Sequence, residues 1–125
     1  MPGFRVLIVD DDSLVALLIE EELRLAGFSV IGKACSGEEA VALAVELCPD
    51  VVLMDVKMPG MGGVEATREI QKRCPAPVVL LTAHDLRTAA ALAAEAGAAA
   101  YLTKSAIRAE LLATLRSVCR PTTGE

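Results

Sequence analysis

Five short apolar runs alternate with five segments of helical spacing, and this alternation limits the possible folds more than any other feature of the chain. The strand-like runs cover residues 4–9, 28–34, 51–54, 77–81 and 98–103, and the helical segments lie after each of them. Apolar strands joined by helices form a parallel sheet that is covered on both faces. Right-handed crossovers leave few topologies, and we expect a flavodoxin-like (βα)5 doubly wound α/β fold with strand order 2-1-3-4-5.

Local signals predict where the helices begin and end. Asp12 or Ser13 is a candidate N-cap for the first helix, and Gly27 is a candidate C′ residue. Ser36, Gly37, Glu38 and Glu39 form a capping-box pattern that opens the second helix, which reaches residue 47. The caps predicted for the helix at 86–96 and for the last helix are Asp85 and Ser105.

The composition predicts one folded domain and excludes several classes of function. The chain has 125 residues, of which 54% are hydrophobic and 23% charged. A net charge of −5 argues against direct binding of this domain to nucleic acid. We find neither a membrane-length apolar run nor a signal-peptide pattern, and we expect a cytoplasmic protein.

The cysteine pattern does not indicate a metal site. The chain has four cysteines and one histidine, without a Cys-x-x-Cys spacing. We interpret Cys48 and Cys119 as small hydrophobic residues of the core, which is the commoner role of a free cysteine.

Polar residues stand where the predicted strands end. Asp10 and Asp11 follow the first strand, Asp55 the third, Thr82 the fourth and Lys104 the fifth. In a doubly wound sheet the carboxyl ends of the strands meet at one rim, where the winding reverses. Carboxylates about 5 Å apart repel each other by roughly 3 kcal/mol per pair at an effective dielectric near 20, so a cation is expected among them. Oxygen ligands with room for waters favour Mg²⁺.

Together these motifs resemble the receiver domains of two-component response regulators, and the resemblance extends over nearly the whole chain. It is closest to the NarL/FixJ class, whose receivers usually precede a DNA-binding domain. The motifs that carry it are Leu7-Ile8-Val9-Asp10-Asp11-Asp12, Met54-Asp55-Val56-Lys57-Met58-Pro59-Gly60, Leu81-Thr82-Ala83 and Tyr101-Leu102-Thr103-Lys104.

The resemblance implies a phosphoacceptor site. Asp55 would accept a phosphoryl group from a sensor histidine kinase or a phosphotransfer protein. Asp11, Asp55 and the backbone carbonyl of Lys57 would bind Mg²⁺, with Asp10 acting mainly through water. Lys104 would pair with the phosphoryl group and Thr82 would donate a hydrogen bond to it. Such a domain is a signalling module with its own phosphorylation and dephosphorylation activity, not an enzyme acting on other substrates.

The resemblance also implies a switch. Thr82 would move toward the phosphoryl group and Tyr101 would rotate into the vacated space, which would change the face formed by the fourth helix, fifth strand and fifth helix. Phosphorylation could then produce a homodimer, helped by the small side chains of the fourth helix (Ala89, Ala90, Ala91, Ala93 and Ala94). Lys57 and His84 stand two residues beyond Asp55 and Thr82, where they would tune the lifetime of the phosphoryl group.

We expect residues 1–120 to form the receiver domain and residues 121–125 to be a C-terminal tail or the start of a linker. No DNA-binding domain fits in 125 residues. Control of transcription by a following domain and a stand-alone receiver that relays phosphate or binds a partner therefore both remain open. A Mg²⁺-dependent aspartyl phosphatase ranks lower, because such sites often place a second aspartate where this chain has Lys57. Many receivers have a proline after the lysine, often in a cis peptide, whereas this chain has Ser105.

Overall fold

A computed structural model describes residues 4–58, 60–74, 76–83 and 86–119. Its strands are β1 (Arg5–Val9), β2 (Ser29–Ala34), β3 (Val51–Asp55), β4 (Val78–Thr82) and β5 (Ala100–Thr103). Its helices are α1 (Ser13–Leu25), α2 (Gly37–Leu47), α3 (Gly63–Arg73), α4 (Leu86–Ala96) and α5 (Ile107–Val118), and a short 3-10 turn, η1 (Lys104–Ala106), precedes α5.

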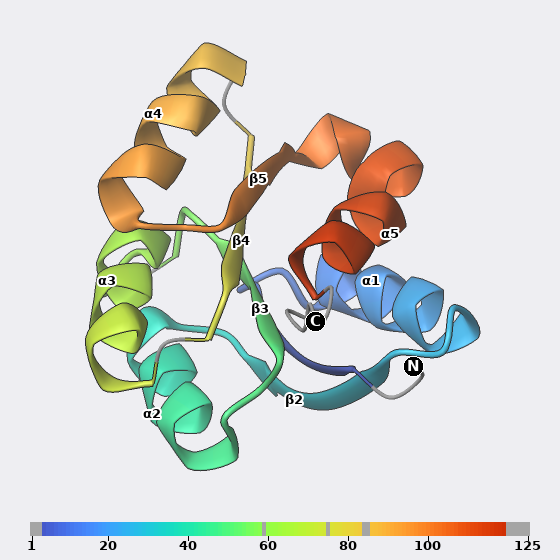
Figure 1. Ribbon diagram of the computed structural model, residues 1–125, viewed down its shortest axis with the longest axis horizontal. Coiled ribbons are helices and arrows are strands. Elements are labelled where there is room, and N and C mark those ends of the chain that lie inside the picture. Colours follow the sequence, from blue (N-terminus) through green and yellow to red (C-terminus); the bar gives the residue numbers. More distant parts are fainter. Residues whose placement is uncertain (1–3, 59, 75, 84–85, 120–125) are drawn as a thin grey trace, which may run out of the picture.

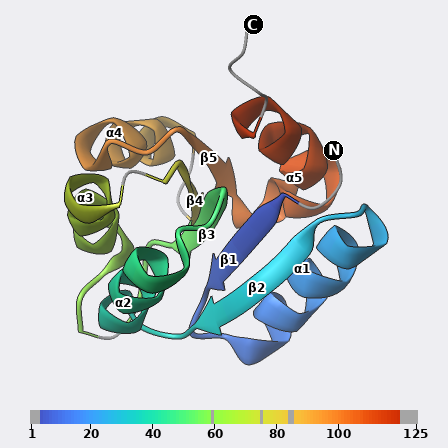
Figure 2. The same ribbon diagram turned by 60° about the horizontal axis from the view of Figure 1, so that its bottom comes forward.

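The five strands form one parallel sheet in the order β2-β1-β3-β4-β5, which confirms the predicted fold. Helices α1 and α5 cover one face, and α2, α3 and α4 cover the other (Figure 1, Figure 2). The central strands are buried. In β3, for example, Val51, Val52, Leu53 and Met54 have no exposed surface. Side chains that alternate along each strand therefore supply two separate cores, one for each layer of helices.

The predicted N-caps of α1 and α2 are present, with one difference in the capping box of α2. Asp12 caps α1, and its Oδ1 accepts hydrogen bonds from the amides of Leu14 at 3.0 Å and Val15 at 3.3 Å. Ser36 caps α2 through the amide of Glu39 at 3.2 Å, whereas the Glu39 carboxylate accepts from the amide of Cys35 and not from that of Ser36.

The predicted N-cap role of Ser105 is wrong. Ser105 lies inside η1, and α5 begins after Ala106 without a side-chain cap. Its hydroxyl instead lies 3.3 Å from that of Thr103. The 3-10 turn delays the start of α5 to Ile107, so Ala106 and not Ser105 holds the N-cap position. Asp85, the cap predicted for α4, lies outside the described residues.

Burial corrects two further interpretations. Cys119 is buried as predicted, but Cys48 is exposed, because it follows the last turn of α2 and does not lie on the buried face of that helix. In α4, Ala89 and Ala93 belong to the core, so only part of its small-residue surface faces solvent. None of the helices in the described part of the chain has the length and apolar character that crossing a membrane requires.

Candidate functional site

The three acids that begin at Asp10 have three different environments. Asp10 follows β1, and its side chain is fully buried. Its amide donates to the carbonyl of Ala34 at 3.0 Å, and its Oδ1 accepts from the amide of Asp12 at 2.9 Å. Asp11 is exposed, and the carboxylate of Asp12 caps α1. Asp12 also lines the pocket at the rim of the sheet, but only Asp10 and Asp11 of this run belong to the acidic cluster that could hold a metal ion.

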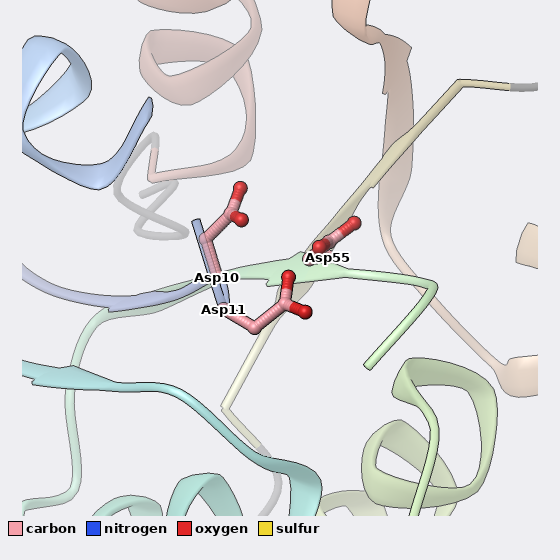
Figure 3. Close-up of side chains that lie close together, drawn as sticks. All are labelled: Asp10, Asp11 and Asp55. Atoms are coloured by element: carbon pink, nitrogen blue, oxygen red, sulfur yellow. The ribbon is translucent and has the colours of Figure 1, made fainter. Parts of the chain in front are cut away.

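Asp55 is the last residue of β3 and lies beside Asp10 and Asp11. The strand register pairs Val9 with Met54, so the chain leaves β1 next to the end of β3. Asp55 is only 3% exposed. Carboxylate oxygens of the three acids all lie within 4.8 Å of one another and could hold a metal ion (Figure 3). The acid crowding expected from the topology is thus present.

Lys104 reaches the acidic cluster from the end of β5. Its Nζ lies 3.2 Å from Oδ1 of Asp55 and 3.5 Å from Oδ2 of Asp10. The side chain is 31% exposed, so the ammonium group lies partly at the rim of the pocket. The peptide bonds of the described residues are all trans, and Lys104 reaches the site without the proline that often follows this lysine in receivers.

The cluster perturbs the protonation of its members. Burial raises the pKa of Asp55 from 3.8 to about 6, and the negative charge of Asp10 adds to this effect. Lys104 and the backbone amide of Lys57 act in the opposite direction. Burial alone would lower the pKa of Lys104, but the charges of Asp55 and Asp10 outweigh it and raise that pKa. Asp55 is thus mostly ionised at neutral pH, opposite a fully charged ammonium group.

An open pocket of about 500 Å³ covers these groups and is large enough for a small phosphorylated group. Its lining includes most of the predicted site residues: Asp11, Asp55, Lys57, Thr82 and Lys104. Thr82, the last residue of β4, is buried at 2% exposure.

The predicted switch and tuning residues lie in different places. Tyr101 is half-buried in β5 and packs against the core beneath α2, α3 and α4. The Lys57 side chain is exposed at the pocket. His84 lies outside the described residues.

Two residues near the site were missed by the sequence reasoning. Glu38, in the first turn of α2, accepts a hydrogen bond from the amide of Met61 at 3.2 Å and so holds the loop that follows Asp55. Gly63 begins α3 so close to β3 that a Cβ atom there would lie 2.1 Å from the carbonyl oxygen of Asp55. The Met-Pro-Gly turn and the paired glycines mark this loop in the sequence, but neither contact can be read from local spacing.

The family model for the response regulator receiver domain matches residues 6–116. The transcriptional regulatory protein PdtaR of Mycobacterium tuberculosis is 46% identical over 100 residues, covering 80% of this chain and 49% of PdtaR. The response regulator GacA of Pseudomonas viridiflava is 47% identical over 116 residues, covering 91% of this chain and 54% of GacA. The chain spans about half the length of the curated relatives it matches.

A solved structure agrees with this match. The receiver domain of the response regulator NarL from Mycobacterium tuberculosis is 31% identical and superposes with a TM-score of 0.86, covering 97% of this chain and 100% of that domain. The family match, the similar relatives and the shared fold all agree with the resemblance seen in the motifs. The chain belongs to the response regulator receiver domain family of two-component signalling.

Proposed function

We propose that Asp55 is the phosphoacceptor of this receiver domain and takes its phosphoryl group from a sensor histidine kinase or a phosphotransfer protein. The observation that carries the proposal is the position of the Asp55 carboxylate, 3.2 Å from the Lys104 ammonium and within 4.8 Å of two further carboxylates. Two of these acids, Asp10 and Asp55, are buried, and three acids beside one ammonium group are more than a simple ion pair needs. Phosphoryl transfer to a carboxylate needs this combination of nucleophile and positive charge.

The residues fit a magnesium ion. Asp11 and Asp55 would hold it with the backbone carbonyl of Lys57, and Asp10 would act mainly through bound water. Such an oxygen-rich donor set suits Mg²⁺, which keeps several of its own waters. When bound, the ion would neutralise charge on the phosphoryl oxygens.

The protein groups supply the remaining chemistry. An ionised oxygen of Asp55 attacks phosphorus, a new P–O bond forms, and the P–N bond to the donor imidazole breaks with its electron pair moving to nitrogen. Lys104 offsets the negative charge of the transferred group, and the Thr82 hydroxyl donates a hydrogen bond to it. Water then hydrolyses the acyl phosphate and resets the domain. Lys57 and His84 would tune the rate of that step.

The output of the domain follows from a change in packing. Movement of Thr82 toward the phosphoryl group and rotation of Tyr101 would alter the face formed by α4, β5 and α5, through which a partner or a second copy would bind. We propose residues 1–120 as the receiver domain and residues 121–125 as a tail or linker, acting in the cytoplasm without direct binding of this domain to nucleic acid.

The relatives suggest how the output would be used. PdtaR is named a transcriptional regulator and extends beyond the matched region, which favours control of transcription. A stand-alone receiver that relays phosphate or binds a partner is the second candidate.

The test is phosphorylation by acetyl phosphate with Mg²⁺ present and absent. We expect a stoichiometric mass increase of the wild type only with Mg²⁺, and none in Asp55→Asn. Asp12→Asn is the matched control, because Asp12 caps α1 outside the acidic cluster and asparagine is an equally good cap. Undiminished labelling of Asp55→Asn would exclude the proposed acceptor.

A further inference from the structure

Two thiols meet where α2 and α3 end, on the edge of the sheet opposite the acidic cluster. Cys48 directly follows α2 and Cys74 directly follows α3, and their sulfur atoms lie 3.5 Å apart. Both cysteines precede strands, β3 and β4 respectively, whereas the acids follow strands. The two helices lie side by side in both views (Figure 1, Figure 2). The pair is therefore separate from the phosphoacceptor site.

The two thiols differ in access. Cys48 is exposed, whereas Cys74 is half-buried. Burial raises the pKa of the Cys74 thiol, and the neighbouring Cys48 raises it further. A reagent in solution consequently reaches Cys48 first, and Cys74 lies behind it within contact distance. This arrangement of an exposed thiol and an adjacent second thiol is what stepwise thiol–disulfide exchange requires.

The backbone at Cys48 is unusual. With φ at 46°, Cys48 is the only non-glycine residue of the described chain in the left-handed region. Glycine or asparagine normally occupies such a helix C-terminal position, and a cysteine there is conformationally disfavoured. The Arg5 guanidinium fixes this conformation by donating to the carbonyls of Cys48 at 2.8 Å and Leu47 at 2.7 Å. A disfavoured backbone conformation that is held in place beside a second thiol suggests that Cys48 has a functional role.

We propose that Cys48 and Cys74 are a redox modification site, at which a reversible disulfide joins the ends of α2 and α3. The oxidant is a low-molecular-weight disulfide such as oxidised glutathione. The Cys48 thiolate attacks one of its sulfurs, forms a mixed disulfide and releases one glutathione thiol. The Cys74 sulfur, after losing its proton, attacks Sγ of Cys48 and releases the second glutathione thiol. Two protein thiols are thus oxidised, and one disulfide is reduced to two thiols.

The native structure needs only a small movement to form this bond. A disulfide brings its sulfurs about 1.5 Å closer than they lie here. The bond would close the segment 48–74, which contains β3 and α3, and would restrict the unfolded chain. We therefore expect the oxidised protein to melt about 5–10 °C above the reduced protein. The inference does not depend on the role proposed for Asp55.

Peptide mapping tests the pairing directly. The full chain is equilibrated with oxidised glutathione in buffer containing a metal chelator, and free thiols are then alkylated. Cleavage after glutamate places each cysteine on its own peptide: 23–38, 47–65, 70–95 and 111–125. We expect peptides 47–65 and 70–95 to be joined, with a mass about 2 Da below the sum of the two reduced peptides. Excess reduced glutathione should separate them again.

Matched variants identify the partners. Cys35→Ser should leave the link intact, because the Cys35 thiol lies by Glu39, not by the pair. In Cys74→Ser, peptide 47–65 should carry a glutathione adduct and should not be linked to peptide 70–95. Cys48→Gly suits the left-handed backbone and should abolish the link without unfolding the protein. Separate glutathione adducts on both peptides, persistently free thiols, or a linked protein that melts at or below the reduced form would each overturn the proposal.

Discussion

Replacing Asp55 by asparagine should stabilise the protein when no divalent cation is present, although the substitution removes the proposed acceptor. The substitution preserves the shape of the side chain and deletes one negative charge from a position that is only 3% exposed. The carboxylates of Asp10 and Asp11 lie within 4.8 Å, and each repels a charge at Asp55 by about 3.5 kcal/mol at an effective dielectric near 20. The Lys104 ammonium at 3.2 Å returns about 5 kcal/mol on the same scale.

The pKa of Asp55 gives the net result of these opposing effects and of burial. A rise from 3.8 to about 6 corresponds to about 3 kcal/mol against the charged form, before screening by water is considered. The pocket is open to solvent and Asp11 is exposed, so screening reduces this value substantially. We expect Asp55→Asn to be about 1–2 kcal/mol more stable than the wild type at pH 8 in chelator.

The pH dependence of this difference has a definite sign. The folded protein holds the proton of Asp55 more tightly than the unfolded chain does, because the folded pKa is the higher one. Ionisation therefore costs stability as pH rises from about 4 to about 6, and the full cost is present above that window. The advantage of Asp55→Asn should vanish near pH 4 and reach its plateau above pH 7.

Urea denaturation followed by circular dichroism measures the difference with and without Mg²⁺. Saturating Mg²⁺ should raise the stability of the wild type and leave Asp55→Asn nearly unchanged, so the gap between them should close or reverse. Asp12→Asn should respond to Mg²⁺ as the wild type does. A less stable Asp55→Asn in chelator at pH 8, or equal responses of both proteins to Mg²⁺, would refute the reasoning.

Two further predictions concern the acidic run and the loop after Asp55. In calorimetric titration, Asp11→Ala should weaken Mg²⁺ binding at least tenfold. Asp12→Ala should bind Mg²⁺ nearly as the wild type does and should mainly lose about 1 kcal/mol of stability, because its helix cap is missing. Equal losses of Mg²⁺ affinity in the two variants would mean that the acidic run is misassigned. Gly63→Ala should lower the free energy of unfolding in urea by about 3 kcal/mol or more, because its Cβ would lie 2.1 Å from the carbonyl oxygen of Asp55. Unchanged stability of Gly63→Ala would show that α3 can move away from β3 at little cost.

The residues that meet at the rim of the sheet could be predicted from the sequence, because local patterns show where each strand ends and all strands of a parallel sheet end at the same edge. Once apolar runs are assigned to strands, the residues after them share one edge, and Asp10, Asp55 and Lys104 meet there whatever the details of the helices. The errors arose where geometry within one turn decides the outcome. Cys48 directly follows the end of α2 and is exposed, and a single 3-10 turn places Ser105 one residue before the N-cap position of α5.

Two contacts between distant segments, which do not join the carboxyl ends of strands, were not predicted for a different reason. Glu38 fits a capping-box pattern, yet its carboxylate accepts from the amide of Met61, which is 23 residues away. The pair Cys48 and Cys74 belongs to two helices whose ends meet only because the sheet places β3 beside β4. Local spacing identifies an element, but it does not specify which ends of two elements meet.

The buried strands explain why the carboxylates of the acidic cluster do not move apart. Asp10 and Asp55 follow four residues each that have no exposed surface, 6–9 in β1 and 51–54 in β3, and backbone hydrogen bonds to neighbouring strands fix where each strand ends. If the Asp10 carboxylate turned away, the part-buried amide of Asp12 would lose its hydrogen bond, and if the Asp55 carboxylate turned away, the backbone amide of Lys57 would lose its hydrogen bond. The repulsion is therefore a property of the fold, and Lys104 offsets only part of it. A cation that binds among these acids relieves the remainder, and this relief adds to the affinity of the folded protein for the ion. By the same reasoning, substitutions that stabilise the cation-free protein at this rim should weaken its proposed binding of Mg²⁺.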